Sequence, residues 1–183
     1  QSLSGVFRLG VLPTIAPYLL PRFFQQLSEK HTDLDIRMLE MKTAPTMAAL
    51  QNGEIDAAII ANQPTESYLQ GDILYYEQFF GYVAHNESIF KKDLIRTADI
   101  NDERLWLLDE GHCFRDQLMR FCQMEKVKVR QAAYRLGSLE TFMRMVESGN
   151  GITFIPELAT LQLSKEQKEL VRPFAIPKPT REI

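Results

Sequence analysis

The sequence is poor in cysteine and histidine, and it has no long apolar run. Its 183 residues include two cysteines and three histidines. Two cysteines are too few for the disulfide framework of a small secreted protein. No apolar stretch reaches the roughly 18 residues that a membrane helix needs. The start, "QSLSGVFRLG", lacks the charged head, apolar middle and small-residue cleavage site of a signal peptide. We therefore expect neither export nor a membrane anchor.

Positive charge is scarce as well. The chain has 21 lysines and arginines against 24 aspartates and glutamates, a formal net charge of −3, and its basic residues form only short pairs. A chain with this charge is a poor candidate for holding nucleic-acid phosphates by itself. Apolar residues, in contrast, make up 45% of the chain, with eleven phenylalanines. This composition is typical of a globular protein, and the length suits one large domain or two small ones.

The first sixty residues alternate between strand and helix patterns. Residues 5–12, "GVFRLGVL", have strand periodicity, and a helical pattern over 15–31 follows with Thr14 in the N-cap position. Pro21 within that pattern favours a bend or a later helix start. "LDIRMLEM" predicts a second strand, "APTMAALQNGE" a short helix ended by Asn-Gly, and "IDAAIIA" a buried third strand. This order is typical of a parallel sheet with crossover helices.

A second α/β unit is predicted after Gly71. The segments "DILYYEQFFGYVAH", "ERLWLLDE", "QAAYRLG" and "ITFIPELA" have strand composition. The segments "CFRDQLMRFCQMEK" and "SLETFMRMVESGNG" are helical in pattern, the latter capped by Ser138. We predict an α/β protein with two similar lobes, joined by strands near 76–80 and 176–181, and a ligand cleft between them. The expected boundaries are 1–76 with 178–183 for one lobe and 77–177 for the other.

Both cysteines lie in one short segment, "LLDEGHCFRDQLMRFCQ", at positions 113 and 122. A Cys-x8-Cys spacing is not that of a zinc site, and histidines are few, so we expect no metal. If 113–122 is helical, the two Cα atoms stand roughly 13–14 Å apart, whereas a disulfide needs no more than roughly 7 Å. A permanent structural disulfide is therefore disfavoured. Two buried unreactive thiols and a redox-gated refolding both remain as interpretations.

The neighbours of Cys113 favour the reactive interpretation. His112 and Arg115 bring positive charge, and the preceding Asp-Glu-Gly turn suggests that Cys113 begins a helix. Positive neighbours and a helix N-terminus both favour the thiolate, which is the reactive form of cysteine. Asp116 opposes this effect, or else pairs with Arg115 and orients it. Cys122 has apolar neighbours and is expected to be less reactive.

The segments "EGHCFRDQLMRFC" and "SLETFMRMVESGNGITFIPELA" resemble the regulatory domain of the peroxide-sensing OxyR branch of the LysR-type transcriptional regulators. "LGVLPTIAPYLLP" and "NGEIDAAIIA" fit the wider LysR class. The resemblance implies a periplasmic-binding-protein-like fold (type 2) with two Rossmann-like subdomains, no enzyme activity and no cofactor. It also implies that Cys113 reacts with hydrogen peroxide and that Cys122 resolves it into a redox-active disulfide. The residues implied to surround the peroxide are Thr14, Thr43, His112, Arg115, Asp116 and Arg181.

The same resemblance implies partners. It predicts a homodimer through helices 15–31 and 138–149, whose apolar residues exceed the needs of one packed face, and a tetramer in the full-length protein. DNA binding would belong to an N-terminal winged helix-turn-helix that this chain lacks, and RNA polymerase is a further expected contact. A cytoplasmic dithiol reductant such as glutaredoxin or thioredoxin would reset the switch. The family also continues beyond the final "REI" into a strand and a last helix.

Each of the residues implied to surround the peroxide also has a simpler structural interpretation. Thr14 and Thr43 can serve as helix caps, His112 as a surface turn residue, and Arg115 with Asp116 as a solvated pair. An effector domain for an ordinary metabolite and a thiol peroxidase are the rival functions, although the Pro-x-x-x-Thr-x-x-Cys element of peroxiredoxins is absent. A free-standing solute-binding protein is disfavoured because no export signal is present.

Overall fold

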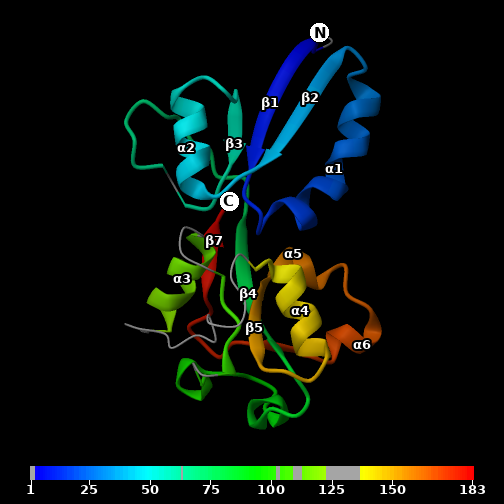
Figure 1. Ribbon diagram of the computed structural model, residues 1–183, viewed down its shortest axis with the longest axis vertical. Helices are drawn as coiled ribbons and strands as arrows, with labels where there is room; N and C mark the ends of the chain where they lie inside the picture. Colours follow the sequence, from blue (N-terminus) through cyan, green and yellow to red (C-terminus); the bar gives the residue numbers. More distant parts are fainter. Residues whose placement is uncertain (1–2, 63, 102–103, 109–112, 123–136) are drawn as a thin grey trace. The chain divides into compact units, whose positions relative to one another are not determined.

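The structure is a computed structural model that describes residues 3–62, 64–101, 104–108, 113–122 and 137–183. The chain divides into two compact units, residues 1–62 with Ile183 and residues 63–182. The elements labelled in Figure 1 or used below are, in chain order, β1 (Gly5–Val11), α1 (Ala16–Lys30), β2 (Leu34–Glu40), α2 (Thr43–Gln51), β3 (Ala57–Ile59), β4 (Tyr76–Val83), η1 (Ser88–Lys91), η2 (Thr97–Asp99), α3 (Cys113–Phe121), α4 (Leu139–Glu147), β5 (Ile152–Pro156), α5 (Glu157–Thr160), α6 (Lys165–Lys168), β6 (Val171–Pro173) and β7 (Thr180–Glu182).

The first unit is built on a parallel sheet with the strand order β2-β1-β3. β1 is the central strand, and it pairs with β2 in register from Gly5–Leu34 to Val11–Glu40. Val11 is fully buried there and Leu9 is 8% exposed. α1 and α2 are the crossovers that parallel neighbours require. The β-α-β-α-β order and the parallel direction predicted for this part of the chain are confirmed.

The start of α1 differs from the prediction. The N-cap position is held by Ile15, with no side-chain cap hydrogen bond, so the prediction of Thr14 as the cap is wrong. Thr14 is instead buried, with 3% of its surface exposed. Pro17 falls in the first turn, where a missing N–H is tolerated, as expected. Pro21 lies inside the helix, so the helix does not start after it.

The second unit is centred on β4, which runs antiparallel to β5, β6 and β7. In Figure 1, α3 lies beside β7 and α4 lies beside β5. Ser138 caps α4 as predicted, because its Oγ accepts a hydrogen bond from the Thr141 N–H at 3.2 Å. The α/β character of both halves is therefore confirmed. Their similarity does not extend to strand direction in the described residues.

One predicted strand, "ERLWLLDE", is wrong for the residues described in it. Leu105 forms a single bridge with Ile152, and no ladder continues from it. Two hydrogen bonds near this bridge use side chains instead: Trp106 Nε1 donates to the Asn150 carbonyl at 2.8 Å, and Thr153 Oγ1 donates to the Trp106 carbonyl at 2.9 Å. The segment is buried although it is not a strand. Most of the predicted strand "QAAYRLG" lies outside the described residues.

Candidate functional site

Helix α3 holds the segment in which the two cysteines occur. It begins at Cys113, and its hydrogen-bond pattern reaches Cys122, whose N–H donates to the Leu118 carbonyl at 2.9 Å. Phe114 and Leu118 are each 1% exposed, and the ring of Phe121 packs edge-on against another aromatic ring at 5.4 Å. The predicted helix over 113–122 is confirmed, and its apolar stripe faces the core.

The geometry of α3 keeps the two cysteines apart. Both are free thiols, and both are half-buried. Nine helical residues correspond to a rise of roughly 13–14 Å and to about two and a half turns. The two side chains therefore leave the helix on opposite sides, at about twice the roughly 7 Å Cα separation that a disulfide allows. No Cys113–Cys122 disulfide can form while residues 113–122 remain helical.

Cys122 lies in a poorly hydrated position at the end of the helix. Burial raises the pKa of its thiol to about 11, because the fold disfavours the charged thiolate. At neutral pH this thiol is protonated, and a protonated thiol is a poor nucleophile. The raised pKa agrees with the expectation that Cys122 is the less reactive thiol, which stays a prediction.

Arg115 points inward from α3. Its residue surface is 7% exposed, and its Nη1 donates to the Leu108 carbonyl at 2.8 Å. Asp116, the next residue, is exposed, and these two described residues form no ion pair with each other. The interpretations of Arg115 and Asp116 as a solvated pair, or of Asp116 as the group that orients Arg115, are therefore wrong. Arg115 instead ties α3 to the segment that precedes the helix.

Gln117 is a feature of this helix that sequence reasoning missed. Its Nε2 and Oε1 are both buried, and neither has a hydrogen-bond partner. It lies one turn beyond Cys113, at the i+4 position where helical side chains meet. That spacing was the available signal, since a glutamine four residues from a reactive cysteine on one helix shares its face.

Arg181 on β7 lies against the same helix. Its Nε donates to Glu77 Oε2 at 2.8 Å, and the two side chains are 0% and 2% exposed. Its guanidinium lies 5.2 Å from the ring centroid of Phe114 and 5.6 Å from that of Phe79. Glu77 Oε1 also accepts from the Leu158 N–H at 3.3 Å. A buried ion pair thus joins β7 and β4, and its cation covers the second residue of α3.

The two predicted threonines belong to the first unit. Thr43 is the first residue of α2, but the N-cap is Lys42 and no side-chain cap bond is formed, so the cap interpretation is wrong. The Thr43 Oγ1 is instead buried without a hydrogen-bond partner. His112 lies outside the described residues. Within the second unit, Arg115 lies on α3 two residues after Cys113, and Arg181 lies over the ring of Phe114 on the same helix.

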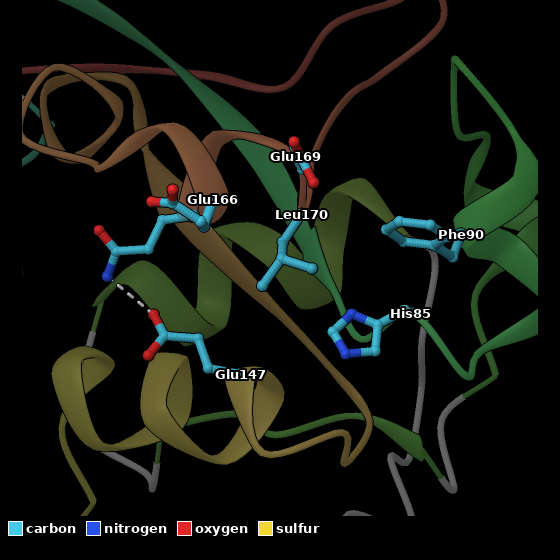
Figure 2. Close-up of a pocket in the computed structure, with 7 residues that line it drawn as sticks. His85, Phe90, Glu147, Glu166, Glu169 and Leu170 are labelled. Carbon is cyan, nitrogen blue, oxygen red and sulfur yellow. Dashed lines mark hydrogen bonds between the residues drawn. The ribbon is translucent and has the colours of Figure 1, made fainter.

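A separate hollow of about 330 Å³ lies elsewhere in the second unit (Figure 2). Glu147 on its wall accepts hydrogen bonds from Tyr82 Oη at 2.7 Å and from Gln167 Nε2 at 2.9 Å, the latter drawn as the dashed line. Burial and the bond to Glu147 raise the pKa of Tyr82. The hollow contains none of the predicted site residues. Its lining is His85, Phe90, Glu147, Glu166, Gln167, Glu169 and Leu170.

Metal-binding groups and membrane-spanning helices are both absent from the described residues. Within them, no group of three or more His, Cys, Asp or Glu side chains is arranged to hold a metal ion. In that same part of the chain, no helix has the length and apolar character needed to cross a membrane. The described side chains on or beside α3 include two thiols, the Gln117 carboxamide, the guanidinium groups of Arg115 and Arg181, and the carboxylates of Asp116 and Glu77.

The two α/β units and the position of Cys113 at the start of α3 agree with one family of proteins. The LysR substrate binding domain family matches residues 1–183, and the chain belongs to this family.

Individual relatives narrow the comparison to one branch of the family. A crystal structure of OxyR from Porphyromonas gingivalis is 57% identical with a TM-score of 0.89, over 98% of this chain and 81% of that one. A structure described as the oxidized form of OxyR is 31% identical with a TM-score of 0.81, over 100% and 85%. The DNA-binding transcriptional dual regulator OxyR of Escherichia coli K12 is 32% identical over 184 residues. That match covers all of this chain, which spans 60% of the length of the E. coli relative. The resemblance inferred from the sequence is confirmed along the whole chain.

Proposed function

We propose that this chain is the redox-sensing regulatory domain of a LysR-type transcriptional regulator that responds to hydrogen peroxide. The observation that carries the proposal is the placement of the two thiols, one on the first residue of α3 and the other just past its last. A bond between them requires the helix to open, so oxidation changes the conformation of the second unit. The similarity to OxyR proteins along the whole chain supports this function.

The chemistry proceeds in two balanced steps. The Cys113 thiolate attacks one oxygen of hydrogen peroxide, the O–O bond breaks, and hydroxide leaves, so that Cys113 becomes a sulfenic acid. Once α3 has opened, the Cys122 thiol attacks that sulfur, the S–O bond breaks, and water leaves as the disulfide forms. A dithiol reductant such as glutaredoxin or thioredoxin returns both thiols by exchange, as in a cytoplasmic switch.

Peroxide recognition is proposed for Thr14, Thr43, His112, Arg115, Asp116 and Arg181 on the strength of the family resemblance. The buried, unpartnered hydroxyl of Thr43 supports a role in hydrogen bonding to a small polar ligand. Replacing Thr14 by valine removes a hydroxyl and roughly keeps the shape. We expect slower oxidation of Cys113 by peroxide and an unchanged rate of alkylation. Equal peroxide rates in the two proteins would assign Thr14 a packing role alone.

Assembly is proposed as a homodimer through α1 and α4, and as a tetramer in the full-length protein. DNA and RNA polymerase contacts would involve the whole regulator. Phe24 on α1 is 39% exposed, which supports a contact surface there. Phe142 and Met143 on α4 are 2% and 1% exposed, so their own unit already uses them. Sedimentation at micromolar concentration should detect a dimer; a monomer in both redox states would contradict this part of the proposal.

The function is tested by mass spectrometry of free thiols before and after one equivalent of peroxide. We expect loss of two thiols and gain of one Cys113–Cys122 disulfide. Cys113→Ser should abolish oxidation, whereas Cys122→Ser should leave a sulfenic acid that dimedone labels. Equal labelling of both thiols by a limiting alkylating agent would contradict the assignment. Sustained turnover at peroxidase rates with a dithiol would favour an enzyme instead.

A further inference from the structure

We propose that Asn52–Gly53, at the C-terminal end of α2 (Figure 1), is a site of spontaneous deamidation that yields aspartate and isoaspartate. The sequence contains a second Asn-Gly pair, Asn150–Gly151, and no third. The two pairs share the chemistry of the reaction, so the fold alone distinguishes them. It leaves the first pair exposed at a helix end and fixes the second among buried groups, and only the first is expected to react in the folded chain.

Deamidation of an Asn-Gly pair needs no reagent other than water. The glycine nitrogen gives its proton to the solvent and attacks the asparagine Cγ; the Cγ–Nδ2 bond breaks, and ammonia leaves with a proton from water. Water then opens the resulting succinimide. Cleavage of the bond from nitrogen to Cγ gives aspartate, and cleavage of the bond from nitrogen to the backbone carbonyl carbon gives isoaspartate. Glycine favours ring closure because it has no Cβ to shield the nitrogen or to restrict the backbone.

The first pair has room for this reaction. Asn52 and Gly53 are both exposed, and a Cβ added to Gly53 would meet no atom within 4 Å beyond its chain neighbours. Gly53 has a φ of +68°, and its N–H donates to the Leu50 carbonyl at 3.2 Å, while the Glu54 N–H donates to the Ala49 carbonyl at 2.9 Å. These two bonds are a Schellman motif, which ends the helix. Helix ends open at little cost in free energy, so the Gly53 nitrogen can reach Cγ without displacing another side chain.

The second pair is held in place on several sides. Gly151 is buried, and a Cβ added there would collide with the Arg104 carbonyl oxygen. Its N–H, which contains the attacking nitrogen, donates to Glu87 Oε1 at 3.2 Å. The Asn150 carbonyl accepts from Trp106 Nε1 at 2.8 Å. Ring closure at this pair has to break both hydrogen bonds and move the backbone against packed atoms, so it waits for a larger and rarer opening of the second unit.

The products change the end of α2. Asn52 Nδ2 now donates to Glu54 Oε1 at 3.2 Å. Either product replaces this amide by a carboxylate, so the hydrogen bond gives way to repulsion between two negative charges. A negative charge is also unfavourable near the C-terminus of a helix. Isoaspartate adds one carbon to the main chain as well, which disrupts the two bonds of the Schellman motif. Deamidation is therefore expected to loosen the last turn of the helix that begins at Thr43.

The test follows both pairs in one sample. The chain is incubated at mildly alkaline pH, digested, and analysed by mass spectrometry for the exchange of an amide for an acid; an isoaspartyl methyltransferase with a labelled methyl donor detects isoaspartate. We expect Asn52 to react at least roughly tenfold faster than Asn150, because opening the buried pair costs more free energy. In urea that unfolds the chain, the two rates should converge. Asn52→Gln should abolish the isoaspartate signal, since the longer amide closes its ring far more slowly, whereas Asn150→Gln should leave the signal unchanged.

Hydrogen exchange separates the effect of the extra carbon from that of the charge. Asn52→Asp introduces the charge alone, so the amides of Gly53 and Glu54 should stay protected in it and should lose protection in the isoaspartate form. Equal rates at Asn52 and Asn150 in the folded chain would overturn the proposal. So would a difference in rate that persists in urea, because sequence rather than fold would then cause it. Unchanged protection of both amides in the isoaspartate form would overturn the expected loosening of α2.

Discussion

Helices α3 and α4 are each nine residues long and lie in the same unit, but only α3 has a polar residue among its buried ones. α4 begins after Ser138, which caps the Thr141 N–H at 3.2 Å. It ends before Gly149, whose φ of +88° is a left-handed conformation that glycine adopts at little cost. Its buried residues are Leu139, Phe142, Met143 and Val146, all of them apolar.

α3 buries polar groups as well as apolar ones. Arg115 is buried beside Phe114 and Leu118, and the Gln117 amide is buried without a partner. Burying polar groups costs free energy unless hydrogen bonds compensate. The two helices are therefore expected to differ in stability. The ends of α4 have the Ser138 cap and Gly149, whereas α3 buries the Gln117 amide without a hydrogen-bond partner. A segment that has to open during function is expected to come from the less stable part of a fold.

Removing one buried phenylalanine from each helix tests this difference most strongly. Phe114→Ala and Phe142→Ala should each lower the free energy of unfolding by about 3–5 kcal/mol in urea titrations. Only Phe114→Ala should also speed conversion of the Cys113 sulfenic acid to the disulfide, because its packing has to be lost in that step. Quenched-flow mass spectrometry measures this conversion. An equal acceleration by Phe142→Ala would remove the distinction between the helices.

The buried ion pair beside α3 gives the next largest expected effect. Glu77→Gln leaves the Arg181 cation buried without its partner, which should lower the free energy of unfolding by about 3–5 kcal/mol. Because Arg181 lies over Phe114, disulfide formation should also accelerate. The control is Glu140→Gln, which removes a 3.6 Å ion pair between half-exposed side chains on α4. That control should change stability by less than about 1 kcal/mol. Similar losses in both variants would contradict the role of the buried pair.

The sequence predicted the parallel sheet, α3, α4 and the Ser138 cap because each depends on local periodicity and on capping residues. It failed where tertiary contacts decide. Residues 105–108 are buried, but only one bridge and one backbone bond, from the Trp106 N–H to the Ile152 carbonyl, tie them to β5, and the other bonds there involve the side chains of Trp106 and Thr153. Charge pairing was also misjudged: Arg115 and Asp116 are adjacent, yet Arg115 points inward. The long-range partner of Arg181, Glu77, is 104 positions away, and the sequence alone did not reveal it.

The raised pKa of Cys122 predicts a pH dependence for the second chemical step. If α3 opens first, Cys122 is hydrated and its pKa returns to the ordinary value of 9.0, so the rate should level off above that pH. Attack from within the intact helix would keep the rate rising toward pH 11.

The free energy of unfolding should also depend on the ionisation of the Cys122 thiol. Folding raises the pKa of the Cys122 thiol from 9.0 to about 11. The contribution of this thiol to the free energy of unfolding is therefore full below pH 9 and is lost between pH 9 and 11. In Cys122→Ser this loss should be absent.

The smallest expected effect concerns the cap of α4. Ser138→Ala removes an acceptor for the Thr141 N–H and should lower the free energy of unfolding by about 1 kcal/mol. The rate of disulfide formation should not change, because we expect α4 to stay folded while α3 opens. Urea titration and thiol mass spectrometry on the same samples measure both quantities. A faster disulfide step in this variant would mean that the two helices open together.

The account depends most directly on the claim that α3 opens when Cys113 and Cys122 are joined. Hydrogen exchange of the backbone amides tests this claim when the fully reduced chain is compared with the chain whose Cys113–Cys122 disulfide has been verified by mass spectrometry. We predict faster exchange across 113–122 in the oxidised chain and unchanged exchange across 139–147. Equal protection of 113–122 in both states would contradict the account, because two thiols roughly 13–14 Å apart on an intact helix cannot form a bond.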